Sequence, residues 1–207
     1  MIDLQIGADT RWRLRERIGG DSKRFGATAE FGCGTGFFTD AIASRAESAL
    51  AADLAPGMLA VARTRCKARN VTFQQEDCQR TSLTDTSFDT AFLSLVIHFT
   101  DPAATLREMA RILKPGGTLV VINLDLFALT PLSRLCANAR ILYYGITRYR
   151  TKPPKHFSKN LISANDLSEL LVNVGFGRIL VEEFKDPSHF SDVPIELIKA
   201  TKEQTFQ

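Results

Sequence analysis

A glycine-rich segment, Glu30-Phe31-Gly32-Cys33-Gly34-Thr35-Gly36, lies between a short apolar run over residues 27–31 and a helix-like segment over residues 36–46. Glycines in such a turn let the backbone bend sharply and approach a ligand without Cβ clashes. Asp53 follows Gly32 by 21 residues, at the end of a second strand-like run. In doubly wound sheets, an acidic group at this point accepts hydrogen bonds from both hydroxyls of a ribose. The pair therefore predicts a nucleoside site on a Rossmann-like sheet.

The rest of the chain alternates strand-like and helix-like segments, which favours βαβ units and a mainly parallel sheet. After residue 124 this rhythm stops, and about 40 residues follow without a clear strand. Ser163 is the predicted N-cap of a later helix, and Gly175 its C-terminal glycine. Two last runs, 178–184 and 193–201, could pair as strands at the sheet edge. The predicted strands cover 27–31, 48–53, 71–75, 88–94 and 118–123, and the predicted helices cover 9–19, 36–46, 56–69, 102–113 and 163–174.

Composition excludes several classes of protein. The 207 residues are 44% apolar with a net charge of +3, typical of one soluble domain without a charge excess that would indicate nucleic acid. No stretch reaches the roughly 20 apolar residues of a spanning helix, and Met1–Leu4 does not resemble a secretory signal. Four cysteines without metal-ligand spacing predict no metal site and reduced thiols, so we expect a cytoplasmic protein.

The spacing of the glycines bears on which nucleoside is bound. A dinucleotide fingerprint needs glycine at the sixth position, where this chain has Phe37, and that departure opposes NAD. Glu30 would repel a pyrophosphate but suits a cationic amino group. S-adenosylmethionine carries such an ammonium together with an adenosine and no phosphate.

With these features the chain resembles the class I S-adenosylmethionine-dependent methyltransferases, in particular the small-molecule "type 11", quinone-methyltransferase-like group. The resemblance covers residues 27–125 closely and 163–201 more loosely. Six segments match in order and at the spacing of the family: EFGCGTG at 30–36, DLAPGML at 53–59, EDC at 76–78, SFD at 87–89 with SLVIHF at 94–99, RILKPGG at 111–117 and LVNVGF at 171–176. The resemblance, together with the seven predicted strands, implies a single domain over 1–207 with an α/β fold. Its sheet would be doubly wound, seven-stranded and mainly parallel, with an antiparallel C-terminal hairpin. A small helical cap would be inserted at about 126–162.

The resemblance also implies roles for individual residues. The glycines would line the methionine part of the cofactor, Glu30 its ammonium, Asp53 the ribose, and Asp77 the adenine amino group. The implied cofactor-binding set is Glu30, Gly32, Cys33, Gly34, Gly36, Asp53, Leu54, Met58, Asp77, Cys78 and Ser94. His98, near the end of the fourth strand, is the candidate catalytic base, and the alternative is that it has no chemical role.

The segment from 126 to 165 is strongly basic. It has seven Lys or Arg and no Asp or Glu, so it carries +7 and leaves −4 for the rest of the chain. As a lid over the acceptor it would favour an anionic or amphiphilic molecule, or contact an anionic membrane surface. Alternatively, it is a solvated basic loop. Its candidate acceptor-binding residues are Tyr143, Tyr144, Tyr149 and His156.

The predicted function is transfer of a methyl group from S-adenosylmethionine to a small-molecule or amphiphilic acceptor by in-line displacement, leaving S-adenosylhomocysteine. Two alternatives remain open: a non-catalytic cofactor-binding or scaffold protein, and an NAD-dependent oxidoreductase. No nucleic-acid partner is expected. The identity of the acceptor and the oligomeric state are not predicted.

Overall fold

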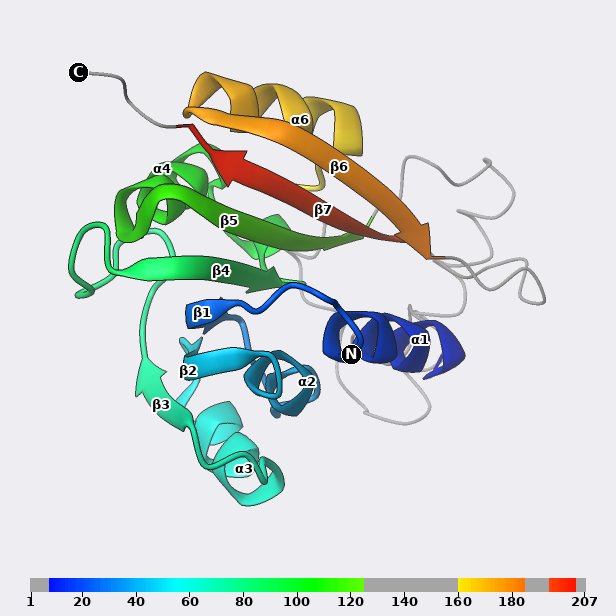
Figure 1. Ribbon diagram of the computed structural model, residues 1–207, viewed down its shortest axis with the longest axis vertical. Coiled ribbons are helices and arrows are strands. Elements are labelled where there is room, and N and C mark those ends of the chain that lie inside the picture. Colours follow the sequence, from blue (N-terminus) through cyan, green and yellow to red (C-terminus); the bar gives the residue numbers. More distant parts are fainter. Residues whose placement is uncertain (1–7, 125–159, 185–193, 204–207) are drawn as a thin grey trace, which may run out of the picture.

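The computed structural model describes residues 8–124, 160–184 and 194–203. They form one seven-stranded sheet with helices on both faces (Figure 1). The strands are β1 (Gly26–Phe31), β2 (Ala46–Asp53), β3 (Val71–Gln75), β4 (Phe88–Ser94), β5 (Leu113–Leu124), β6 (Phe176–Phe184) and β7 (Ile195–Lys202). The helices are α1 (Ala8–Gly19), α2 (Thr39–Ala43), α3 (Pro56–Arg65), α4 (Pro102–Ile112) and α6 (Ala164–Asn173), with a 3-10 turn, η2 (Ile97–Phe99).

The strand order is β3-β2-β1-β4-β5-β7-β6, which runs from the bottom to the top of Figure 1. The first five strands are parallel, and β7 pairs antiparallel with both β5 and β6. This confirms the predicted doubly wound sheet with an antiparallel C-terminal hairpin. The order reverses beside β1, and ligands of such sheets bind at the carboxyl edge next to this switch point.

The central strands are apolar because each face is covered by helices. Alternate residues of β5 belong to different cores: Val120 and Ile122 pack with Leu14 and Ile18 of α1, whereas Leu119 and Val121 pack with residues of α4 and α6. Leu14 and Ile18 are buried, so α1 is an amphipathic helix packed on the sheet.

Two helices are shorter than predicted. The segment expected as a helix over 36–46 is helical only from Thr39 to Ala43, because the turn with its positive-φ glycines extends into it. The helix expected over 56–69 ends at Arg65, where the Asp40 carboxylate accepts hydrogen bonds from the amides of Lys67 and Ala68, at 2.9 and 3.2 Å.

The fifth strand is longer than predicted. It starts at Leu113 and not at residue 118, and residues 114–117 form an irregularity inside the strand. Gly117 permits this, because a Cβ there would lie 2.8 Å from the Lys114 carbonyl oxygen. At the start of α6, Ser163 is the N-cap as predicted, and its hydroxyl accepts from the Asp166 amide.

Candidate functional site

The glycine turn follows β1 at the carboxyl edge of the sheet. All three glycines have positive φ: +72° at Gly32, +55° at Gly34 and +81° at Gly36. A Cβ at Gly32 would lie 2.6 Å from the Cβ of Val96, and one at Gly36 would touch Ala62 at 3.4 Å, whereas one at Gly34 would meet nothing within 4 Å. Gly32 is therefore required by the packing of the protein itself, and Gly34 faces space that a ligand can occupy.

Asp53 ends β2 beside this turn, and the backbone fixes its carboxylate. One oxygen accepts from the Gly34 amide at 2.8 Å and the other from the Ala55 amide at 2.9 Å. Two large apolar side chains next to it face solvent, Leu54 at 63% exposure and Met58 at 46%. An oriented carboxylate beside exposed apolar side chains and an open glycine backbone fits an adenosine with its ribose.

Glu30 is buried within β1, at 1% exposure. Its carboxylate accepts hydrogen bonds from the hydroxyls of Thr39, at 2.7 Å, and Ser94, at 3.0 Å. Burial, which these two hydrogen bonds only partly offset, raises the pKa of Glu30 to about 7. The group is thus close to half protonated at neutral pH, and a nearby ammonium would favour its ionised form.

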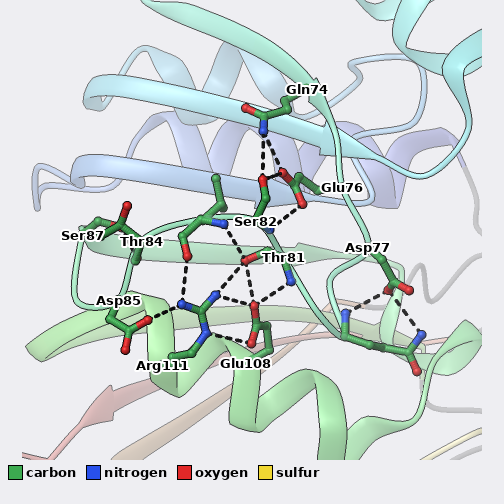
Figure 2. Close-up of polar contacts among 12 residues, drawn as sticks. Gln74, Glu76, Asp77, Thr81, Ser82, Thr84, Asp85, Ser87, Glu108 and Arg111 are labelled. Atoms are coloured by element: carbon green, nitrogen blue, oxygen red, sulfur yellow. Dashed lines mark hydrogen bonds and ion pairs between the residues drawn. The ribbon is translucent and has the colours of Figure 1, made fainter.

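Asp77 lies near the start of the loop between β3 and β4, directly after Glu76 (Figure 2). One of its oxygens accepts from the backbone amide of Gln79 at 2.9 Å and from the Gln79 side-chain amide at 3.3 Å. The Gln79 side-chain oxygen in turn accepts from the amide of Asp101, the N-cap of α4, at 2.9 Å. The orientation of Asp77 is therefore coupled to the start of that helix.

Arg111 of α4 makes a network of contacts with residues further along the same loop (Figure 2). Its guanidinium pairs with Glu108, at 2.6 Å, and with Asp85, and donates to the Leu83 carbonyl at 2.8 Å. Glu108 also accepts from the amide and the hydroxyl of Thr81, each at 2.7 Å. The hydrogen bond from Arg111 lowers the pKa of Glu108 to about 2. This network holds the loop that carries Asp77 against α4.

His98 and two cysteines are buried near the same edge. Burial lowers the pKa of His98 to about 4, so its imidazole is neutral at pH 7, and the ring packs on Phe99 with centroids 4.2 Å apart. Burial raises the pKa of Cys33 and raises that of Cys78 to about 11, so both thiols are protonated at neutral pH. A catalytic role for His98 stays a prediction.

The structure brings most of the predicted cofactor residues to one edge, because β1, β2 and β4 are parallel and end there. The predicted acceptor-binding residues Tyr143, Tyr144, Tyr149 and His156 lie outside the described residues, as does nearly all of the predicted cap.

The sequence did not indicate three residues that make polar contacts near this edge of the sheet: Thr39, Gln79 and Asn123. Only Asn123 leaves a signal in the sequence, as an amide that interrupts the apolar run of its strand.

The opposite edge of the sheet has a hollow of about 450 Å³ that includes none of the predicted cofactor residues. It lies at the amino ends of β1 and β4 and is lined by residues 23–26, Asp89, Thr90 and residues 114–117.

Among the residues that the structure describes, no three or more His, Cys, Asp or Glu side chains are placed to hold a metal ion. None of the described helices has the length and apolar character needed to span a membrane.

Comparison with known proteins agrees with this geometry. Residues 29–121 match the family model described as "Methyltransferase domain". A malonyl-[acyl-carrier protein] O-methyltransferase of Serratia marcescens is 39% identical over 94 residues, which are 45% of this chain and 36% of that protein. A demethylmenaquinone methyltransferase of Thermus thermophilus is 36% identical over 125 residues, 58% of this chain and 57% of that protein. The chain thus spans about half the length, or less, of these curated relatives.

Solved structures match the fold over nearly the whole chain. An S-adenosylmethionine-dependent methyltransferase from Mesorhizobium loti is 22% identical, with a TM-score of 0.67 over 95% of this chain and 99% of that one. Phosphoethanolamine N-methyltransferase 2 of Haemonchus contortus, solved with S-adenosylmethionine, is 19% identical, with a TM-score of 0.66 over 96% of this chain and 53% of that one. The family model, the curated relatives and the sheet order agree, and S-adenosylmethionine is the cofactor of this group. Over residues 29–121 the chain is thus similar to the methyltransferase family model and to a demethylmenaquinone methyltransferase, and it has the fold of solved S-adenosylmethionine-dependent methyltransferases.

Proposed function

We propose that the whole protein transfers a methyl group from S-adenosylmethionine to a small organic acceptor. The observation that carries this proposal is the Asp53 carboxylate, which two backbone amides orient beside the open space at Gly34. Such a carboxylate can receive both ribose hydroxyls without reorganising. The solvent-facing side chains of Leu54 and Met58 would then flank the adenine, and Asp77 would accept from its amino group.

The sulfonium of the cofactor supplies the reactive methyl group when it is bound. The contribution of the protein is then to hold the cofactor and the acceptor in line, which can lower the barrier by about 7–11 kcal/mol. Glu30 would compensate the charge of the cofactor ammonium, and Ser94, which donates to Glu30, would fix that carboxylate. His98 is neutral, as a proton acceptor must be, but its pKa of about 4 makes it a weak base.

The acceptor class follows only coarsely from the relatives. One relative is named for a quinone and the other for a malonyl group on a carrier protein, so the proposed acceptor is a small molecule or a small group on a carrier. The basic segment at 126–165 supports an anionic or amphiphilic acceptor, or a peripheral contact with an anionic membrane. Each of these belongs to the proposal, as does a cytoplasmic location.

Calorimetry with S-adenosylhomocysteine and with NAD tests the cofactor part of the proposal. We expect binding of S-adenosylhomocysteine alone, weakened about 10- to 100-fold by Asp53→Asn, because that variant loses a charge-assisted acceptor of about 1.5–3 kcal/mol. Glu47→Gln, on an exposed residue at the other end of β2, is the matched control and should bind normally. Binding of NAD alone would overturn the proposal.

A second experiment tests transfer itself. Isotope-labelled S-adenosylmethionine is incubated with the protein and with metabolite and lipid extracts, and labelled products are separated. We expect at least one labelled product that is absent with the Asp53→Asn variant. Tight binding of the cofactor without a product in any extract would favour the scaffold alternative.

A further inference from the structure

The hollow at the amino edge of the sheet has no part in the proposed methyl transfer. It lies where β1, β4 and β5 begin, at the opposite end of these strands from the glycine turn. Two of the six segments that match the family, 87–89 and 111–117, contribute residues to its lining. Its volume of about 450 Å³ falls within the range of about 300–1,000 Å³ that is usual for small-molecule sites.

The lining of this hollow carries more positive than negative charge. Its cations are Lys23, Arg24 and Lys114. The one carboxylate that lines it among the described residues is Asp89, so the net charge of the lining is +2. Asp89 is already satisfied within the protein, because it accepts from the Lys114 ammonium at 2.8 Å and from the Ala27 amide at 2.9 Å. The charges of Lys23 and Arg24 are therefore left for a ligand.

Neither Lys23 nor Arg24 pairs with a carboxylate of the described residues. The Lys23 ammonium donates to the neutral hydroxyl of Thr118 at 3.2 Å. Arg24 makes no hydrogen bond or ion pair with any part of the chain that the structure describes. The nearby Asp21 carboxylate accepts from the Lys23 backbone amide at 3.1 Å and forms its ion pairs with side chains of α1 and β7 instead.

The backbone that carries these two cations is held in place. The next residue, Phe25, is 6% exposed and packs edge-on against Phe92 of β4, with ring centroids 5.2 Å apart. Its amide donates to the Arg45 carbonyl oxygen at 2.9 Å. Lys114 is held by its ion pair with Asp89. A ligand would thus meet cations whose backbone is already ordered, which reduces the entropic cost of binding.

These features favour a ligand with two negative charges and some apolar surface. A concave site lined mainly by one sign of charge attracts ligands of the opposite sign. A guanidinium offers parallel N–H groups to phosphate oxygens, and a lysine offers a point charge. A phosphate monoester carries a charge of about −1.5 to −2 at pH 7, which matches the surplus of the lining. Phe25 and Pro115 add apolar surface that a bare phosphate ion would leave uncovered.

We propose that the hollow is a second ligand site, which binds a small organic phosphate. Lys23, Arg24 and Lys114 bind the phosphate group, and the organic part lies against Pro115. The ligand can bind while the cofactor site is occupied, because none of the lining residues belongs to the predicted cofactor set. The site is independent of the proposed function, since it would exist in a protein that transfers no methyl group.

Three small anions test this assignment. Phenyl phosphate, benzenesulfonate and inorganic phosphate are titrated into ¹⁵N-labelled protein with and without S-adenosylhomocysteine, and binding is read from the backbone amide shifts in nuclear magnetic resonance spectra. We expect phenyl phosphate to give saturable shifts centred on residues 23–26 and 116–117. Benzenesulfonate, which has a similar shape but one charge, should bind about tenfold more weakly. Inorganic phosphate should also bind more weakly, because it lacks the ring.

Two substitutions separate recognition of the charge from a general effect on the fold. Lys23→Gln and Arg24→Gln should each weaken the binding of phenyl phosphate about threefold, and the double variant should weaken it about tenfold. Both side chains are exposed, so thermal unfolding should be unchanged. Arg107→Gln, on an exposed arginine of α4 outside the hollow, is the matched control and should bind like the wild type.

Several results would overturn this inference. Shifts centred on residues 32–36, or loss of binding when S-adenosylhomocysteine is added, would place the phosphate in the cofactor site instead. Absence of saturable shifts, equal affinity for benzenesulfonate, or full affinity in the double variant would show that the surplus charge binds no phosphate. Equal affinity for inorganic phosphate would show that the hollow takes a bare ion and no organic ligand. Failure of S-adenosylhomocysteine to bind, by contrast, would count against the proposed function alone.

Discussion

Two buried acidic residues lie at the carboxyl edge of the sheet, on opposite faces, and their surroundings differ. Glu30, on the face covered by α1 and α2, receives a hydroxyl hydrogen bond on each carboxylate oxygen. Glu196, on the face covered by α4 and α6, is bonded to Asn123, whose own oxygen has no partner. Both carboxylate oxygens of Glu30 thus have partners within the protein, whereas the pair of Glu196 and Asn123 leaves one buried acceptor, Asn123 Oδ1, without a hydrogen bond.

The largest expected effect concerns the glycine turn, which lies next to Glu30 along the chain. Gly32→Ala should lower the free energy of unfolding by about 3–5 kcal/mol, because it combines a strained positive φ with a Cβ only 2.6 Å from the Cβ of Val96. Gly34→Ala, which has open space, should cost only about 1–2 kcal/mol of backbone strain. Urea denaturation monitored by circular dichroism measures both.

Of the same two variants, the more stable one, Gly34→Ala, should lose affinity for the cofactor. Gly34→Ala should reduce the affinity for S-adenosylhomocysteine more than tenfold although it remains folded, because its methyl group fills the space that the cofactor needs. Equal losses of stability in the two variants, with cofactor affinity unchanged at Gly34→Ala, would show that the turn is preassembled for packing and not for a ligand.

Titration of Glu30 is expected to have the next largest effect. Its pKa is about 7 in the folded protein against 4.5 in the unfolded chain, so between these values the folded state holds a proton that the unfolded state has lost. The contribution is present below pH 4.5 and lost as the pH rises through 7, amounting to about 3 kcal/mol in total. Urea unfolding at several pH values should show this fall in the wild type.

Glu30→Gln removes the titrating group, so its free energy of unfolding should fall less than that of the wild type between pH 4.5 and 7.5. Glu183→Gln, which alters an exposed carboxyl of β6, is the control and should follow the wild type. Parallel curves for Glu30→Gln and the wild type would show that Glu30 does not titrate between pH 4.5 and 7.5, contrary to its raised pKa.

The smallest expected effect concerns the loop that holds Asp77. Arg111 lowers the pKa of Glu108 to about 2, so this pair stabilises the fold above pH 4.5 and its contribution is lost as the pH falls toward 2. Because the guanidinium is partly in solvent, we expect Glu108→Gln to cost about 1 kcal/mol at pH 7. Thermal unfolding and calorimetry with S-adenosylhomocysteine measure the loss and a two- to threefold weaker affinity.

Asp85→Asn is a matched control for that variant. Its carboxylate also contacts Arg111 but is 71% exposed, so the expected cost is below about 0.5 kcal/mol. If Asp85→Asn cost as much as Glu108→Gln, the buried half of the network would not be what holds the loop.

Much of the fold could be predicted because its signals are local. The runs at 71–75 and 88–94 coincide with β3 and β4, since short runs that contain Val, Thr and Phe between polar loops can be recognised in short windows. The ends of helices were less predictable. The end of α3 depends on Asp40, which is 27 residues before the Lys67 amide that it binds.

For the site, the glycine turn and Asp53 could be found because a spacing defines them, and the structure joins them by a hydrogen bond. Thr39 and Asn123 could not be found in this way. The partner of Asn123 is 73 residues away, and the two meet only through the register of β5 against β7. A single sequence does not determine such a register.

The place of β7 in the sheet has a consequence for synthesis on the ribosome. The strand from Ile195 to Lys202 lies between β5 and β6, so β5 keeps an open edge until residue 202 has left the exit tunnel. During that time the apolar residues 119–122 of β5 lack their neighbouring strand, and an uncovered apolar edge can pair with other chains. The sheet is therefore completed only after β7 has been synthesised, although five of its strands precede residue 125.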